Sequence, residues 1–156
     1  MNSYFYIKAF RAYKIIKVDS SDNMLDVIKQ QLVNNKEFKS VLDEAAEAFV
    51  DYTHAPLWPS YNLEIINRLL EINYLEIIPI NHIEILDSDP NHYILIDYGE
   101  NPELYSVNAE NSNSAEKKFI DRKLSFFEGR VYDLNEILDH YDMWSYTAPI
   151  DAIINL

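Results

Sequence analysis

Histidine and carboxylate side chains are the residues of this sequence whose spacing comes nearest to a metal site. His82 and Glu84 alternate as residues on one face of a strand do, and His92 follows after a turn. Neither H-E-x-x-H nor H-x-x-E-H occurs in the chain, so no protease-type zinc spacing is present. We therefore expect these histidines to be structural or surface residues, and we expect no bound metal and no cofactor.

The segment from Asp87 to Asn91 resembles the start of a calcium-binding loop, with side-chain oxygens at its first, third and fifth positions. Its sixth position is His92, where a calcium loop needs glycine. Its twelfth is Tyr98, where a bidentate glutamate belongs. We interpret the segment as a hairpin turn, because Asp, Ser, Pro and Asn all favour turn geometry.

Composition excludes several common chemistries. The absence of cysteine removes disulfides, thiolate nucleophiles and zinc sites with sulfur ligands. With only two glycines, the chain has no dinucleotide-binding fingerprint, P-loop or G-x-S-x-G elbow. Paired carboxylates of the glycosidase type carry no information here, because 26 acids form many such pairs by chance. A hydrolase that uses carboxylates and one histidine remains an alternative to a binding function.

The elements that must position these side chains indicate an α+β fold, in which helices flank a small antiparallel β-meander. A chain of 156 residues fits one domain, residues 1–156, with one core. The run at 82–86 is expected to pair antiparallel with the run at 92–98 across the turn. The predicted strands span residues 74–80, 82–86, 92–98 and 104–107.

Helices are predicted where apolar residues recur at intervals of three and four residues. Residues 3–18 fit either a helix or a strand, and we favour the helix for its apolar stripe. Residues 54–60 hold two prolines and form a loop, in which Trp58 either plugs the core or anchors a partner. The other predicted helices span residues 23–34, 37–52, 61–73, 115–127 and 133–144.

Charge is the main positive signal. The formal net charge is −13, and residues 40–116 carry fifteen acids against the single base Arg68. Such a surface repels DNA, RNA and anionic lipid and attracts basic partners. No run of 18 apolar residues occurs, and four bases interrupt the first 18 residues. We expect a cytoplasmic protein that binds neither nucleic acid nor membrane.

The predicted helix at 133–144 separates its side chains into two faces. One face is apolar, and the other is acidic without a neutralising base, which is mildly unfavourable in an isolated helix. Aromatic residues follow directly, and acids beside aromatics suit a basic target. The residues of this first acidic set are Asp133, Glu136, Asp139, Tyr141, Asp142 and Trp144. A second acidic set comprises Asp87, Asp89, Asp97, Glu100 and Glu103.

A small acidic chain with such faces resembles the immunity proteins that neutralise nuclease toxins, including those of colicins and of contact-dependent growth inhibition systems. The resemblance is one of physical type, carried by the two acidic sets. It implies a binding protein rather than an enzyme, whose carboxylates pair with the lysines and arginines of a basic toxin and occlude its active or substrate-binding surface. An acidic adaptor or a nucleic-acid mimic that blocks a DNA-binding protein is the alternative.

Overall fold

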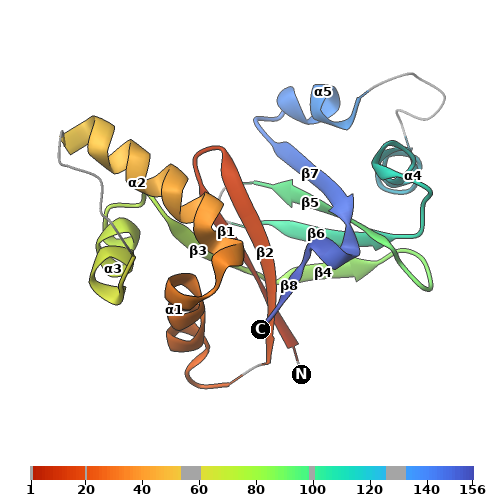
Figure 1. Cartoon of the computed structure of the whole chain (residues 1–156). Helices are drawn as coiled ribbons and strands as arrows, with labels where there is room; N and C mark the ends of the chain where they lie inside the picture. The colour runs from red at the N-terminus through yellow and green to blue at the C-terminus, as the bar shows by residue number, and fades with distance from the viewer. Residues whose placement is uncertain (1, 20, 54–60, 99–100, 126–132) are drawn as a thin grey trace. The chain divides into compact units, whose positions relative to one another are not determined.

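The chain folds as an α+β protein, as its periodicity predicts (Figure 1). A computed structural model describes residues 2–19, 21–53, 61–98, 101–125 and 133–156. The residues divide into two compact units. Unit 1 comprises Met1–Pro79 and Ile153–Leu156, and unit 2 comprises Ile80–Ala152.

Unit 1 is built on a four-stranded sheet whose order is β3-β1-β2-β8. The two central strands are antiparallel and pair along their full length, and β8 adds to β2 in parallel. The last strand therefore returns the end of the chain to the unit in which it began. The strands are β1 (Asn2–Ala9), β2 (Ala12–Asp19), β3 (Glu76–Ile80) and β8 (Ile154–Asn155).

The helix favoured for residues 3–18 is wrong, because these residues form the β1–β2 hairpin. Ala9 pairs with Ala12, so the turn contains only Phe10 and Arg11, and Phe10 adopts a positive φ of 48°. Aromatic and β-branched residues dominate both arms, and such side chains pack well on a pleated surface. Cross-strand pairing therefore determines the secondary structure of these residues, and the weak helical periodicity of their apolar side chains does not.

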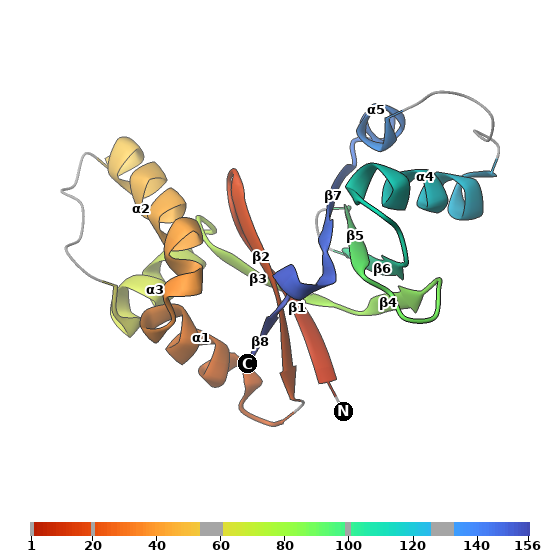
Figure 2. The same cartoon turned by 45° about the vertical axis from the view of Figure 1, so that its right-hand side comes forward.

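Three helices lie on one side of this sheet (Figure 2). The middle one packs on both central strands, and its buried face includes Val41, Leu42 and Ala45, as its periodicity predicts. A 3₁₀ turn, η1 (Lys36–Phe38), precedes it and buries Phe38. The helices are α1 (Met24–Asn34), α2 (Lys39–Thr53) and α3 (Leu63–Glu71).

Unit 2 contains a second four-stranded sheet, of order β4-β6-β5-β7. β5 pairs antiparallel with β6 on one side and with β7 on the other, whereas β4 pairs with β6 in parallel. The predicted antiparallel pairing of 82–86 with 92–98 is therefore wrong, because β6 lies between these strands. The strands are β4 (His82–Ile85), β5 (His92–Asp97), β6 (Glu103–Val107) and β7 (Trp144–Pro149).

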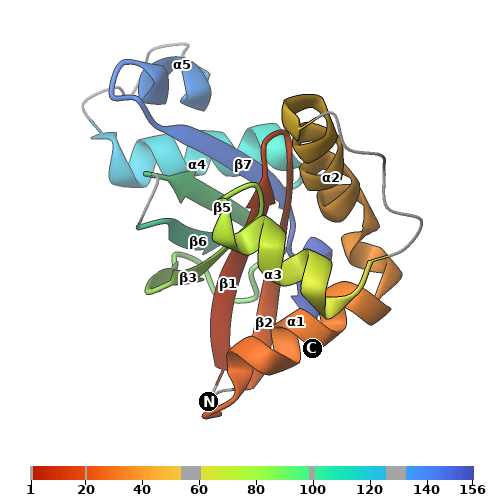
Figure 3. The ribbon, with the colours of Figure 1, turned by 90° about the vertical axis from the view of Figure 1, so that its left-hand side faces the viewer.

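Two helices, α4 (Ser112–Lys123) and α5 (Leu134–Asp139), cover one face of this sheet (Figure 3). Alternate residues of the central strand β5, Ile94 and Ile96, point to this face, and they join a buried cluster with residues of both helices. A short 3₁₀ turn, η3 (Ile150–Ala152), follows β7.

The acidic helix predicted at 133–144 ends early, at Asp139. Asp142 adopts a left-handed φ of 56°, and the Met143 N–H bonds back to the Leu138 carbonyl, which closes the helix end. Trp144 instead opens β7, a strand that the periodicity did not reveal. Its alternating aromatic and hydroxyl residues suit an edge strand paired with β5.

The described residues form two clusters of buried apolar side chains, one in each unit, where the sequence predicted one core. That the chain is a single cooperative domain stays a prediction. Connectivity favours it, because the sheet of unit 1 takes β8 from residues that follow unit 2.

The return of β8 can be tested with substitutions at its apolar positions. Ile154 and Leu156 pack against the core of unit 1, and the Leu156 N–H bonds to the Lys17 carbonyl at 2.9 Å. Replacing both with alanine should lower the free energy of unfolding by about 2 kcal/mol, because each half-buried side chain loses part of its transfer energy. Urea denaturation measures this loss, and the exposed Asn155→Ala provides the control, with a change within about 0.5 kcal/mol.

Candidate protein interface

The sheet of unit 2 brings residues of both predicted acidic sets to one end. Asp97 closes β5 and pairs with Trp144, the first residue of β7. Glu103 opens β6 and pairs with Ile96, one residue before Asp97. Asp97 and Glu103 of the second set therefore lie at the same end of the sheet as Trp144 of the first set.

Side-chain hydrogen bonds fix α5 at this end. Asp133 caps the helix by accepting from the Asn135 N–H at 2.9 Å. The Asn135 side-chain oxygen accepts from the Ser145 N–H at 2.8 Å and from the Ser145 hydroxyl at 3.0 Å. Ser145 is buried, so this contact satisfies polar groups of β7 while it holds the helix against the strand.

The acids that follow Asp133 face outward. Glu136, Asp139 and Asp142 are exposed, and none of them forms an ion pair within the described ranges. Tyr141 is 57% exposed and Trp144 is 48% exposed, which is unusual for side chains of this size. Acidic and aromatic side chains are thus available together, and we name this group, with Asp97 and Glu103, the acidic end of unit 2.

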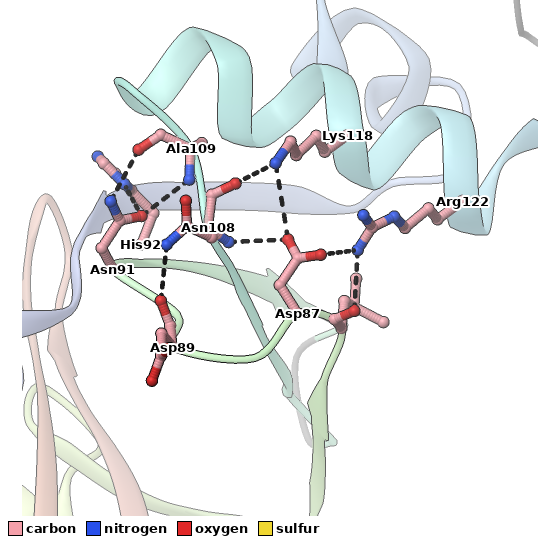
Figure 4. A network of polar contacts seen from close by, with 9 residues as sticks. Asp87, Asp89, Asn91, His92, Asn108, Ala109, Lys118 and Arg122 are labelled. Carbon is pink, nitrogen blue, oxygen red and sulfur yellow. Dashed lines mark hydrogen bonds and ion pairs between the residues drawn. The ribbon is translucent and has the colours of Figure 1, made fainter.

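Asp87 and Asp89 lie at the opposite end of the sheet, about 16 Å away along β5. Their segment connects β4 to β5 across the end of β6 (Figure 4). Asp87 accepts from the Asn108 N–H at 2.8 Å, and the Asn108 side chain donates to the Asp89 carbonyl at 2.7 Å. The carboxylate of Asp87 therefore has a structural role, Asp89 contributes only its carbonyl oxygen, and both residues lie apart from the acidic end.

Helix α4 neutralises the charge of this segment. The guanidinium of Arg122 lies 2.8 Å from Asp87 and also donates to the Leu86 carbonyl, and Lys118 lies 3.8 Å from Asp87. The hydrogen bond from Arg122, together with that from the Asn108 backbone, holds the pKa of Asp87 below its usual range. On the same helix Lys123 forms an ion pair with Glu84, which lowers the pKa of that carboxyl.

This internal pairing leaves the negative charge of unit 2 unbalanced. Unit 2 contains fifteen acids and five bases, whereas unit 1 contains eleven acids and eight bases. Three of the five bases of unit 2 are Lys118, Arg122 and Lys123, which lie against Glu84 and Asp87. The thirteen other acids of unit 2 thus stand against only two other bases in its sequence.

An apolar pocket of about 280 Å³ opens beside the acidic end. Its lining includes neighbours of the acids in sequence: Tyr141 and Met143 flank Asp142, and Leu138 precedes Asp139. α4 and β5 complete the wall. The lining residues are Ile96, Tyr98, Phe119, Leu124, Ile137, Leu138, Tyr141 and Met143.

Folding raises the pKa of two tyrosines near the pocket, Tyr98 and Tyr105. Burial raises the pKa of Tyr105, and the hydrogen bond that its hydroxyl donates to Glu103 raises it further. Burial and the charge of Glu103 likewise raise the pKa of Tyr98. Both tyrosines therefore remain hydrogen-bond donors at neutral pH. Among the described residues, the lining contains no carboxylate, histidine or lysine that could act as a general base.

The histidines do not converge as the metal hypothesis requires. His82 pairs with Glu103 at one end of β6, whereas His92 pairs with Val107 at the other, about 13 Å away. His92 is buried, and its ring lies 2.9 Å from the side-chain oxygen of Asn91. Within the described residues, no group of three His, Asp or Glu side chains is arranged to hold a metal ion.

Some predicted residues lie outside the described part of the chain, namely Glu100 of the second set and Trp58. Sequence reasoning also missed functional candidates, Tyr98 and Met143 at the pocket. Tyr98 had a signal, because it is an aromatic residue at the end of a predicted strand run and next to an acid. Met143 had none, since its place in the lining depends on where α5 ends.

Comparison of the chain with protein-family models, curated proteins and solved structures gives no match. None of the described helices has both the length and the apolar composition needed to cross a bilayer.

The Asp87 network predicts a pH-dependent stability. A carboxylate whose pKa is lowered by folding contributes stability above its unfolded pKa and loses it as the pH falls through the folded value. Asp87→Asn should therefore unfold at lower urea than the wild type at pH 7, with the difference shrinking below the ordinary aspartate pKa of 3.8. Urea titrations from pH 7 to about pH 2.5 measure it.

Asp89→Asn is the matched control, because the side chain of Asp89 is exposed and only its carbonyl oxygen accepts a hydrogen bond. Asparagine also tolerates the positive φ of 50° at this position. The control should show no pH-dependent difference. If the difference in urea stability between the wild type and Asp87→Asn stayed constant with pH, it would contradict the ionic role of Asp87.

The contact between Asn135 and Ser145 predicts that α5 depends on one amide side chain. Asn135→Ala leaves the buried N–H and hydroxyl of Ser145 without this acceptor, and should lower the free energy of unfolding by about 1–3 kcal/mol. The exposed Asn113→Ala on α4 should change it by less than about 0.5 kcal/mol. Equal stability of the two variants would show that α5 is held by apolar packing alone.

Proposed function

We propose that this protein is an inhibitor of the immunity type, which binds a basic protein toxin through the acidic end of unit 2. The observation that carries the proposal is the uneven use of charge. Bases of α4 pair with Glu84 and Asp87, while exposed acids that form no ion pair within the described residues collect beside exposed aromatics on α5 and after it. Exposed aromatic side chains supply binding energy, and the carboxylates supply selectivity for a basic partner.

The mechanism follows from what a nuclease toxin needs. Such an enzyme holds nucleic-acid phosphates with lysine and arginine side chains. Carboxylates at the acidic end would pair with these cations and occupy the surface that the substrate needs. No chemical step is involved, so inhibition is reversible and depends on affinity alone. Charge complementarity can raise association to about 10⁸–10⁹ M⁻¹s⁻¹ at low salt, against about 10⁵–10⁶ M⁻¹s⁻¹ without it. Rapid capture suits self-protection.

The arrangement of polar groups favours binding over hydrolysis. A hydrolytic site brings an acid or base, and often a nucleophile, to a shared point in a cleft. The pocket of unit 2 is instead apolar along its described lining, and only two tyrosine hydroxyls are available there. Glu116 is the carboxylate whose pKa burial raises, and it accepts a hydrogen bond from Thr147 rather than lining the pocket.

Charge reversal on α5 tests the proposal. The test applies if the coding sequence next to that of this protein encodes a basic toxin. That toxin is then produced in bacteria, once alone and once together with this protein. Wild-type chain should restore growth, and the double variant Glu136→Lys, Asp139→Lys should not. Both side chains are exposed, so folding is unaffected, while binding should weaken by about 2 kcal/mol or more, roughly thirtyfold. Growth curves and stopped-flow association at two salt concentrations measure the effect.

The matched control reverses two exposed acids on a helix of unit 1, Glu64→Lys and Glu71→Lys. It changes the net charge equally, so it should retain growth rescue and most of the association rate. A partner that is acidic or neutral would contradict the proposal. Equal loss of rescue in both double variants would show that total charge, rather than the acidic end, governs protection.

A further inference from the structure

The apolar pocket beside α5 is larger than a packing defect. At about 280 Å³ it lies just under the range of about 300–1,000 Å³ typical of small-molecule sites. It therefore has room for one large side chain rather than for a nucleotide or a drug-sized ligand. Its floor is the buried core of the unit, including Ile137 and Leu138, whereas Tyr98 and Tyr141 remain 46% and 57% exposed at its mouth.

The chemistry of the lining decides what can enter. An ammonium or guanidinium group inside the pocket would lose its hydration without finding a carboxylate in the described lining, and burying an unpaired charge is strongly unfavourable. An apolar side chain gains free energy there, at about 25 cal/mol per Å² removed from water. The occupant of the pocket itself is therefore apolar.

The surroundings of the mouth decide what can flank the occupant. Asp139 and Asp142 are exposed on either side of Tyr141, and Glu136 lies one helical turn before Asp139. Glu103 pairs with the lining residue Ile96 on the neighbouring strand. Lys123, which precedes the lining residue Leu124, is already paired with Glu84. Residues that flank an inserted side chain therefore meet mainly carboxylates, which favours lysine or arginine at those positions.

Resting on the function proposed above, we infer that this pocket is the anchor site of the interface. It receives an aliphatic side chain, leucine or isoleucine, from a segment of the partner protein in which lysine or arginine stands on each side. The apolar anchor supplies most of the affinity, and the acids at the mouth select the basic segment. Such a central desolvated pocket within a polar rim is the usual arrangement of an interface hot spot.

Three capped tripeptides test this inference without knowledge of the partner: Lys-Leu-Lys, Glu-Leu-Glu and Lys-Ser-Lys. Each is titrated into the full chain, with methyl NMR signals of Ile96, Leu138 and Met143 as the readout. Lys-Leu-Lys should shift these signals with a dissociation constant on the order of millimolar. Glu-Leu-Glu should bind at least about tenfold more weakly because its charges are repelled. Lys-Ser-Lys should leave the pocket methyls unshifted because it has no anchor.

Methyl signals from the core of unit 1, Ile66 and Leu69, serve as the internal control and should not move. Tyr141→Ala removes one wall of the mouth at an exposed position and should weaken Lys-Leu-Lys binding at least about tenfold. Leu25→Ala, an equally exposed truncation on α1, should leave that binding unchanged. Pocket methyls that do not respond to Lys-Leu-Lys, or that respond equally to Glu-Leu-Glu, would overturn the inference.

The peptide experiment and the growth assay can fail separately. If α5 charge reversal abolishes rescue but the pocket methyls do not respond, the acidic end binds its partner without this anchor, and the inference alone is overturned. If the methyls respond as expected but no basic toxin is neutralised, the pocket binds apolar anchors flanked by bases, and the immunity function is what fails.

Discussion

The connection between β4 and β5 is the constraint on which unit 2 depends. These strands flank β6, so residues 86–91 must cross the end of that strand, over about two strand spacings or 10 Å. A crossing segment carries backbone groups that need partners. Leu86 and Asn91 donate their N–H groups to β6 carbonyls, and the carboxylate of Asp87 accepts from the Asn108 backbone. Without these bonds, the backbone groups of the crossing segment would be left unpaired, which would disfavour the parallel pairing of β4 with β6.

This crossing also determines where the charge of the unit is available. The carboxylate of Asp87 attracts Arg122 and Lys118 of α4, and Lys123 pairs with Glu84 on β4. Three of the five bases of the unit are used in this way. The exposed acids Glu136, Asp139 and Asp142, on α5 and after it, form no ion pair within the described residues. The same distribution of charge thus stabilises the β4–β5 connection and leaves the acids of α5 available for binding.

The sequence was most informative where a feature depends on neighbours along the chain. The apolar face of α5, with Leu134 and Ile137, and the acid between these residues follow from helical spacing. The strand runs of β4, β5 and β6 were also found within a residue or two. Local patterns failed where two outcomes have similar propensity, as in the β1–β2 hairpin, and where one residue with positive φ, Asp142, ends a helix.

By itself the sequence determined the fold class, the acidic charge and the exclusion of motif-based chemistries, because composition and short-range periodicity suffice for these. Tertiary structure alone decided the order of the strands, and with it which acids share a surface. The physical reason is that strand order depends on pairings between distant residues, such as Ile96 with Ser145, and on ion pairs such as Asp87 with Arg122. Such pairings leave no local period. They separate Asp87 from Asp97, and they leave the pocket open beside the acids of α5.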